Sequence, residues 1–221
     1  MPHRTEEEFH LRNLIICEGP DDVAFFAALI EKRTLPKFHI RYTGKPDVRG
    51  VRRGGNSLFG ETLRSYKVRR DFHVIKDILL VTDSDADPER SFDKVKTQVL
   101  DVGFSPPHSP LMRSNGCPAI SIMVIRQGPR GNLECYCTEA VRSADPVNSA
   151  FVDGFMSQVI NEEWTPEMVG KLWLRVALAS RYRQNPFIHL GELIRQAPDK
   201  IPLEHVSFNS VANYLATFGA A

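Results

Sequence analysis

The sequence predicts an α/β protein with a mostly parallel sheet flanked by helices and with a helical C-terminal extension. Short apolar runs alternate with amphipathic helical patterns over residues 12–125, as the strands and crossover helices of parallel sheets do. After residue 125 the apolar residues follow helical periodicity only. The apolar runs end in polar or Gly-rich sequence, which is where open parallel sheets bind their ligands.

The first strand is predicted over residues 14–17, where branched apolar residues precede Glu-Gly-Pro. Such runs without alternation are typical of strands that are buried on both faces. A helix over residues 20–32 follows directly. Pro20 suits its first position, and Asp21 and Asp22 suit the positive end of the helix dipole.

The same patterns predict the remaining elements. We expect strands at 38–42, 78–81 and 119–125, and helices at 58–70, 89–102, 133–142, 150–162, 166–182, 190–196 and 210–218. The stretch 105–118 is rich in Pro, Ser and Gly, which indicates a loop. We therefore expect a sheet domain over residues 11–140 and a helical extension over 141–221 packed on it. The extension's aromatic side chains Trp164, Trp173 and Phe187 are expected in its core.

The composition excludes several classes of protein. The 221 residues are 42% hydrophobic and 25% charged, which excludes disordered, collagen-like and coiled-coil chains. The net charge of +1 excludes a uniformly basic nucleic-acid binder but not a segregated charge pattern. The sequence contains neither a signal peptide nor a membrane span, so we expect a cytoplasmic protein without membrane contact. The four cysteines lack the two close pairs of a zinc site and are expected to be free thiols.

Carboxylate side chains follow two of the predicted strands. Glu18 comes after the first strand, and Asp83 and Asp85 come after ILLVT. If these strands are neighbours in the sheet, their carboxyl ends bring the acids to one edge. Carboxylates that lie so close repel one another unless a cation neutralises them. Oxygen ligands suit Mg²⁺ or Mn²⁺, so we expect one or two such ions at this edge.

Acidic residues also cap helices and end strands, and this simpler interpretation is weighed for each acid. It is favoured for Asp21 and for Asp87, because each stands where a helix begins. It is disfavoured for Glu18, Asp83 and Asp85 taken together, because a Glu before Gly-Pro caps no predicted helix.

Two other interpretations of the DSDAD segment differ in the chemistry they predict. A calcium loop that starts at Asp83 would need Gly and Glu where the sequence has Pro88 and Lys94, so it is rejected. A phosphatase of the haloacid-dehalogenase type would use Asp83 as a nucleophile that forms an aspartyl-phosphate. That motif usually lies near the N-terminus and continues with Gly-Thr, and it leaves Glu18 unexplained. It remains a minor alternative.

The two acidic motifs resemble those of the Toprim domain, the metal-binding module of topoisomerases, primases, recombination proteins and OLD-family nucleases. In that family a strand ends in Glu-Gly, an acidic residue follows four positions after the Glu, and a later strand ends in Asp-x-Asp. The corresponding segments are LIICEGPDD, with Glu18 and Asp22, and ILLVTDSDAD, with Asp83 and Asp85. The resemblance covers residues 11–140 and implies a Rossmann-like Toprim fold with these four acids as metal ligands.

The length and the motifs of the chain narrow the range of Toprim proteins that it can resemble. The length leaves no room for the domain that carries the topoisomerase tyrosine, and the zinc module of bacterial primases is missing. Stand-alone types remain, such as the 5S ribosomal RNA maturase type and relatives of the OLD nucleases. The OLD pattern continues with an acid after the next strand and a Lys on a later helix, which Glu134 in GNLE and Lys171 match. The alternative for Glu134 is an ordinary acid in the first turn of a helix, and the alternative for Lys171 is a solvated helix lysine.

Basic residues concentrate between residues 33 and 76, where twelve Lys and Arg minus three acids give a local excess of +9. Such a strip is typical of enzymes that act on polyanions, and a solvated charged face is the alternative. The Gly-rich stretch 50–56 would bring backbone amides close to a phosphate. The expected nucleic-acid-binding residues are Arg49, Arg52, Arg53, Arg64, Lys67, Arg69 and Arg70.

The function expected from this resemblance is a Mg²⁺- or Mn²⁺-dependent phosphodiesterase that acts on DNA or RNA as a nuclease. Glu18, Asp83 and Asp85 would hold metal at the reacting phosphate, and Asp22 and Glu134 would complete one or two sites. Lys171 would offset charge that develops on the phosphate. The alternative is a non-catalytic module that binds nucleic acid or an ATPase partner. A separate ATPase partner and a homodimer are both left open.

Overall fold

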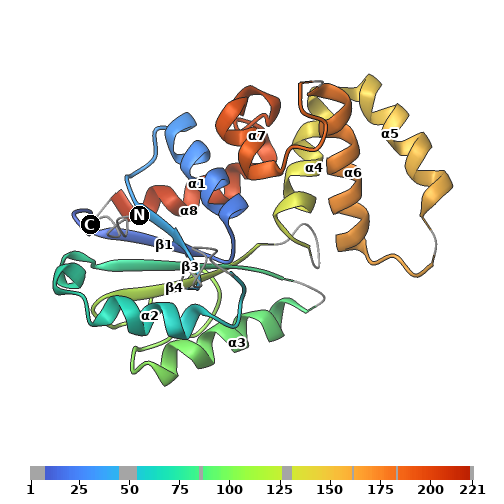
Figure 1. Cartoon of the computed structure of the whole chain (residues 1–221). Coiled ribbons are helices and arrows are strands. Elements are labelled where there is room, and N and C mark those ends of the chain that lie inside the picture. The colour runs from blue at the N-terminus through green and yellow to red at the C-terminus, as the bar shows by residue number, and fades with distance from the viewer. Residues whose placement is uncertain are drawn as a thin grey trace, which may run out of the picture.

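The computed structural model describes residues 8–44, 54–84, 87–125, 131–160, 162–182 and 184–219. Within them the chain forms a four-stranded, all-parallel sheet flanked by helices and followed by a helical C-terminal stretch (Figure 1). The predicted α/β fold class is therefore confirmed. Four expected site residues lie outside the described ranges: Arg49, Arg52, Arg53 and Asp85.

The order of the strands creates a switch point in the middle of the sheet. The strands are β1 (Asn13–Cys17), β2 (His39–Tyr42), β3 (Asp77–Asp83) and β4 (Ala119–Ile125), arranged in the order β2-β1-β3-β4. β2 pairs with one side of β1, and β3 pairs with the other side of β1, where Ile16 lies opposite Leu80. Open parallel sheets bind ligands beyond the carboxyl ends of the strands that flank such a point.

The helices agree closely with the predicted ones. They are α1 (Pro20–Lys32), α2 (Phe59–Lys67), α3 (Pro88–Asp101), α4 (Leu133–Ala144), α5 (Pro146–Val159), α6 (Pro166–Arg181), α7 (Leu190–Gln196) and α8 (Asn209–Ala216). The predicted helix 58–70 instead ends at Lys67 and is followed by the short 3-10 helix η1 (Arg70–Val74). α5 starts before the expected residue 150, because the side chain of Asp145 accepts a hydrogen bond from Asn148 N at 3.1 Å and Pro146 occupies the first turn.

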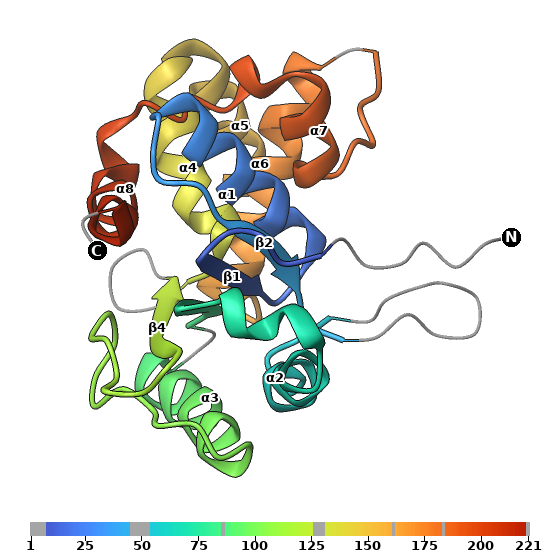
Figure 2. The same ribbon diagram turned by 90° about the vertical axis from the view of Figure 1, so that its left-hand side faces the viewer.

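Two apolar layers cover the two faces of the sheet (Figures 1 and 2). Alternate strand residues such as Leu14 and Ile16 pack with α2 and α3, whereas Ile15 and Cys17 pack with α1, α4 and the C-terminal helices. This follows from the two-residue period of a strand. The C-terminal helices therefore share one core with the sheet, and the expected boundary after residue 140 falls inside α4. No helix of the described ranges is long and apolar enough to cross a membrane.

Candidate functional site

Glu18 links the ends of β1 and β3, the two strands that flank the switch point, by hydrogen bonds of its side chain. It lies one residue beyond β1, and its Oε1 accepts a hydrogen bond from the backbone N–H of Asp83 at 3.0 Å. The same oxygen accepts a hydrogen bond from the hydroxyl of Thr82. These bonds turn the carboxylate toward the end of β3. The sequence analysis did not predict this role for Thr82. The only sequence signal for it is that Thr82 directly precedes Asp83.

Asp83 is the last residue of β3, and its carboxylate is buried in an acidic environment. Its Oδ1 is buried and has no hydrogen-bond partner among the described residues. Burial raises the pKa of Asp83 well above its usual range, and the charges of Asp22, Glu18 and Glu134 raise it further, while Lys171 lowers it. A buried carboxylate oxygen without a partner is costly, so the group requires a proton or a cation.

Asp22 lies in the first turn of α1, beside Glu18. Its Oδ2 accepts a hydrogen bond from Gly19 N at 2.9 Å, which closes the start of the helix. Burial raises the pKa of Asp22 to about 7, and the charges of Glu18, Glu134 and Asp21 act in the same direction. Asp22 thus closes the start of α1 and also belongs to the acidic cluster around Asp83.

The two aspartates for which a structural role was favoured do make such contacts. Asp21 accepts a hydrogen bond from Gly191 N at the start of α7, at 3.0 Å. Asp87 caps α3, because its side chain accepts hydrogen bonds from Glu89 N at 3.0 Å and from Arg90 N at 3.1 Å. The interpretation of Asp87 as a helix cap is confirmed.

Glu134 is held near Asp83 by the contacts that begin α4. The hydroxyl of Ser84, the residue after β3, donates to Gly131 O at 2.8 Å, and Ser84 N donates to the same oxygen at 3.1 Å. The side chain of Asn132 then accepts a hydrogen bond from Cys135 N at 3.0 Å, which caps α4. Glu134 therefore occupies the first turn of a helix that is anchored to the end of β3.

A cavity of about 340 Å³ at the carboxyl edge of the sheet collects these residues. Its lining includes Glu18, Asp21, Asp22, Gly54, Gly55, Asp83, Glu134 and Lys171. Five of the residues expected at the site therefore meet in one place, although they come from the two flanking strands and from α1, α4 and α6. Lys171 is solvent-exposed, and it is the cation of α6 that opposes the negative charge around Asp83.

Two glycines from the expected phosphate-binding stretch also line this cavity. A β-carbon on Gly54 would lie 2.0 Å from the carbonyl oxygen of Glu18, so no other residue fits there without a shift of the backbone. Gly55 N donates to Glu18 O at 3.1 Å and to the hydroxyl of Thr43 at 2.9 Å. The described end of the stretch is thus fixed against the end of β1.

The described basic residues lie elsewhere. None of the four, which are Arg64, Lys67, Arg69 and Arg70, lines the acidic cavity. Arg69 pairs with Asp71, with Nη2 and Oδ2 2.6 Å apart, and its guanidinium lies over the ring of Phe9, which precedes β1. Lys67 donates to the carbonyl of Val102 at 3.0 Å, just beyond α3. Because α2 leads back to the start of β3, these residues approach the amino edge of the sheet. Their role in nucleic-acid binding stays a prediction.

The acid cluster provides the oxygen donors that Mg²⁺ and Mn²⁺ prefer. The unpartnered Oδ1 of Asp83 is the feature that fits a bound cation best. In the part of the chain that the structure describes, no three Asp, Glu, His or Cys side chains are arranged so that they could hold a metal ion. Two of the carboxylates are partly engaged by backbone amides, Glu18 with Asp83 N and Asp22 with Gly19 N. Asp85 lies outside the described residues.

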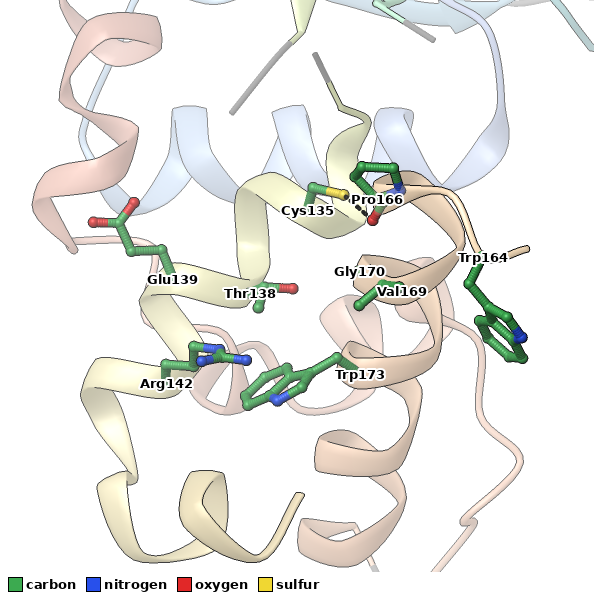
Figure 3. A pocket seen from close by; sticks show the side chains of 9 residues that line it. All are labelled: Cys135, Thr138, Glu139, Arg142, Trp164, Pro166, Val169, Gly170 and Trp173. Carbon is green, nitrogen blue, oxygen red and sulfur yellow. Dashed lines mark hydrogen bonds between the residues drawn. The ribbon is translucent and has the colours of Figure 1, made fainter. Parts of the chain in front are cut away.

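A second cavity, of about 490 Å³, lies between α4 and α6, next to the acidic one along both helices (Figure 3). At its upper end the thiol of Cys135 lies 3.8 Å from the carbonyl oxygen of Pro166, beside Gly170. At its lower end the guanidinium of Arg142 lies 4.4 Å from the centre of the Trp173 ring. Trp173 is buried as predicted, whereas Phe187, also expected in the core, is 89% exposed in a turn before α7.

The sequence was compared with known proteins and families. Residues 12–218 match the model of the family described as "Protein of unknown function (DUF3226)". The chain belongs to this family. Comparisons with curated proteins and with solved structures gave no significant match. The DUF3226 match includes the sheet, the C-terminal helices and all residues that line the acidic cavity.

Proposed function

We propose that the chain is a Mg²⁺- or Mn²⁺-dependent phosphodiesterase of the Toprim type that cleaves nucleic acid. The observation that carries the proposal is the buried Oδ1 of Asp83, which has no hydrogen-bond partner among the described residues. Three further carboxylates raise the pKa of this group. Evolution retains such an arrangement at a cost in stability chiefly where a bound ligand compensates it.

The residues have distinct roles in this proposal. Glu18, Asp22, Asp83 and Glu134 would hold the ion together with Asp85. A divalent ion in such a site supplies an activated water and withdraws charge from the phosphate. Lys171 would balance the negative charge on the phosphate oxygens as they approach the acidic cavity. A β-carbon on Gly55 would meet no atom within 4 Å, so the missing side chain there leaves room for a sugar–phosphate backbone on that side.

A second candidate function is a non-catalytic module that binds nucleic acid or an ATPase. One observation favours it, namely that no three potential ligands in the described residues are arranged to hold a metal ion. The two candidates differ in what a chelator does. Cleavage by the phosphodiesterase stops in EDTA, whereas binding by the module persists.

The test uses the full chain and labelled single- and double-stranded DNA and RNA, in Mg²⁺, Mn²⁺ or EDTA. Asp83→Asn removes the central carboxylate charge. Asp87→Asn is the matched control, because Asn also caps helices and Asp87 caps the start of α3 without lining the cavity. We expect metal-dependent cleavage that Asp83→Asn lowers roughly 100-fold or more and that Asp87→Asn leaves unchanged.

The other outcomes discriminate between the candidates. Binding that persists in EDTA without any cleavage would support the non-catalytic module. Cleavage that survives Asp83→Asn in a clean preparation would contradict the proposed site. Phosphomonoester turnover with a phosphoryl group trapped on Asp83 would support the phosphatase alternative.

A further inference from the structure

Helix α5 exposes an apolar ridge to solvent. Val147, Phe151, Phe155 and Val159 recur every four residues along it, and Phe151 and Phe155 are 75% and 46% exposed. Side chains at this spacing lie on one helix face. Ile160, directly after α5, and Met168, in the first turn of α6, are further exposed apolar side chains. Figure 1 shows α5 at the outer edge of the molecule, where it runs along α6.

The fold does not account for this ridge. α5 already buries Val152 and Met156 on its inner face, where they join the core of the sheet. Single exposed apolar residues are common on protein surfaces, but a contiguous set that includes two phenylalanines indicates a surface that another molecule covers.

The ridge carries no charge. Asp153 is the sole charged residue in the sequence of α5. Its carboxylate accepts a hydrogen bond from Trp173 Nε1 at 2.7 Å and pairs with Arg142 at 2.7 Å, so it faces α4 and α6. Interface centres are similarly depleted in charge and enriched in aromatic side chains. A partner chosen by charge complementarity would need charges on this face, whereas an uncharged face can meet its own copy without repulsion.

The ridge is bordered by small residues. Ala150, Gly154 and Ser157 are exposed beside Val147 and Phe151 on the helical projection. A β-carbon on Gly154 would meet no atom within 4 Å, so packing within the chain does not require this glycine. A glycine within a helix costs about 1 kcal/mol relative to alanine. A close helix from outside the chain would explain its presence.

The ridge and the row of small residues form a self-complementary face. Two α5 helices in antiparallel orientation would place the phenylalanines of each copy against the small residues of the other, as ridges pack into grooves. The contact is then isologous, which is the commonest interface geometry among homo-oligomers. The four apolar side chains of the ridge and the three small residues beside it present roughly 500 Å² per copy. Two copies would therefore bury about 1,000 Å², which is the lower limit for a specific interface.

We propose that two copies of this chain associate through α5, antiparallel, about a twofold axis near Gly154. The ridge spans Val147 to Val159, so its midpoint lies beside Gly154. Residues near the midpoint meet their own counterparts, and residues near one end meet those of the other end. This proposal is independent of the proposed enzymatic activity.

The first experiment measures the mass of the full chain in solution by sedimentation equilibrium up to about 100 μM, where even weak dimers form. We expect a dimer of the 25.0 kDa chain. Phe151→Glu with Phe155→Glu should weaken dimerisation roughly 100-fold, because charges then oppose each other in a dry contact. Phe187→Glu is the matched control, since this phenylalanine is 89% exposed and lies outside α5. Circular dichroism verifies that each variant is folded.

The second experiment tests the axis. In a Cys117→Ser background, which removes the exposed thiol, Gly154→Cys should form a disulfide-linked dimer on mild oxidation. Val147→Cys should not, because the two copies of residue 147 would lie about 20 Å apart along the helices. A monomeric wild type would overturn the proposal and leave the ridge to a different partner. A dimer that survives the glutamates, or equal cross-linking at both positions, would overturn it as well.

Discussion

Gly170 of α6 lies directly against Cys135 of α4. A β-carbon on Gly170 would be only 2.3 Å from the Cys135 thiol sulfur, so the two helices can approach this closely only because residue 170 has no side chain. Glu134 precedes Cys135, Lys171 follows Gly170, and both line the acidic cavity. The contact between Gly170 and Cys135 therefore sets the position of the ammonium group of α6 relative to the acid on α4.

Gly170→Ala should separate the two helices and disturb the cavity. We expect a loss of about 1–3 kcal/mol in the free energy of unfolding, as overpacking of a close contact typically causes. Metal-dependent cleavage should fall as well, because Lys171 moves with α6. Urea denaturation and the cleavage assay measure the two effects. Gly60→Ala on α2 is the control, because its β-carbon would make only an ordinary 3.4 Å contact with the side chain of Gln98.

The double variant Cys135→Ala, Gly170→Ala tests whether the effects of Gly170→Ala arise from its steric clash with the Cys135 sulfur. Removing the sulfur relieves the shortest contact, so stability and activity should recover in part. If Gly170→Ala alone left both quantities unchanged, the contact would not position Lys171.

Asp83→Asn should stabilise the chain in EDTA at pH 8. The substitution removes a buried carboxylate whose pKa is raised by burial and by its acidic neighbours. A neutral amide avoids both the desolvation and the repulsion, so we expect a gain of about 1–2 kcal/mol in the free energy of unfolding. Asp87→Ala should do the opposite and lose about 1 kcal/mol, because it removes the cap of α3. A destabilised Asp83→Asn would mean that Asp83 has a structural partner.

Local sequence signals predicted most of the fold. The predicted ranges 20–32 and 119–125 coincide with α1 and β4, because caps and unbroken apolar runs are encoded by adjacent residues. β3 is longer than expected, so Asp83 belongs to the strand itself rather than to the loop after it. Phe187 was wrongly expected in the core, because the sequence does not reveal that it falls in a turn on the surface.

The acids of the site were found from the sequence, but the contacts that hold them were not. Glu18 comes directly after a buried strand and Asp83 ends one, and both positions are marked in the sequence by the apolar run before them. The need for glycine at Gly170 and Gly54 depends on which segments pack against them, and these partners are distant in the sequence. The position of Lys67 likewise could not be predicted locally, because the direction of α2 places it away from the cavity.

The stability of the metal-free chain should fall as the pH rises from about 4 to 7. The pKa of Asp22 is raised from its ordinary value of 3.8 to about 7 in the folded chain. Between these values the folded state binds more protons than the unfolded state, so the free energy of unfolding decreases with pH. The stabilisation is complete below about pH 4 and lost above about pH 7. The raised pKa of Asp83 acts in the same direction.

Urea denaturation in EDTA across this pH range measures the slope, and Asp22→Asn should reduce it. Saturating Mg²⁺ should raise stability most at pH 8, because a cation then replaces the missing proton and binds the folded state only. A slope of the opposite sign would show that the acids of the cavity do not repel one another.

Arg52 and Arg53 should contribute more to nucleic-acid binding than Arg70. Arg53 directly precedes Gly54 in the sequence, and Gly54 lies against Glu18 in the acidic cavity. Arg70 begins η1, which leads to the start of β3 at the opposite edge of the sheet. Each cation that contacts a phosphate adds to the salt dependence of binding. Arg52→Ala with Arg53→Ala should therefore weaken binding of labelled DNA or RNA and lower its salt dependence, measured by fluorescence anisotropy in EDTA. Arg70→Ala should have a smaller effect on both. Equal effects would indicate that the polyanion also follows α2 to the amino edge of the sheet.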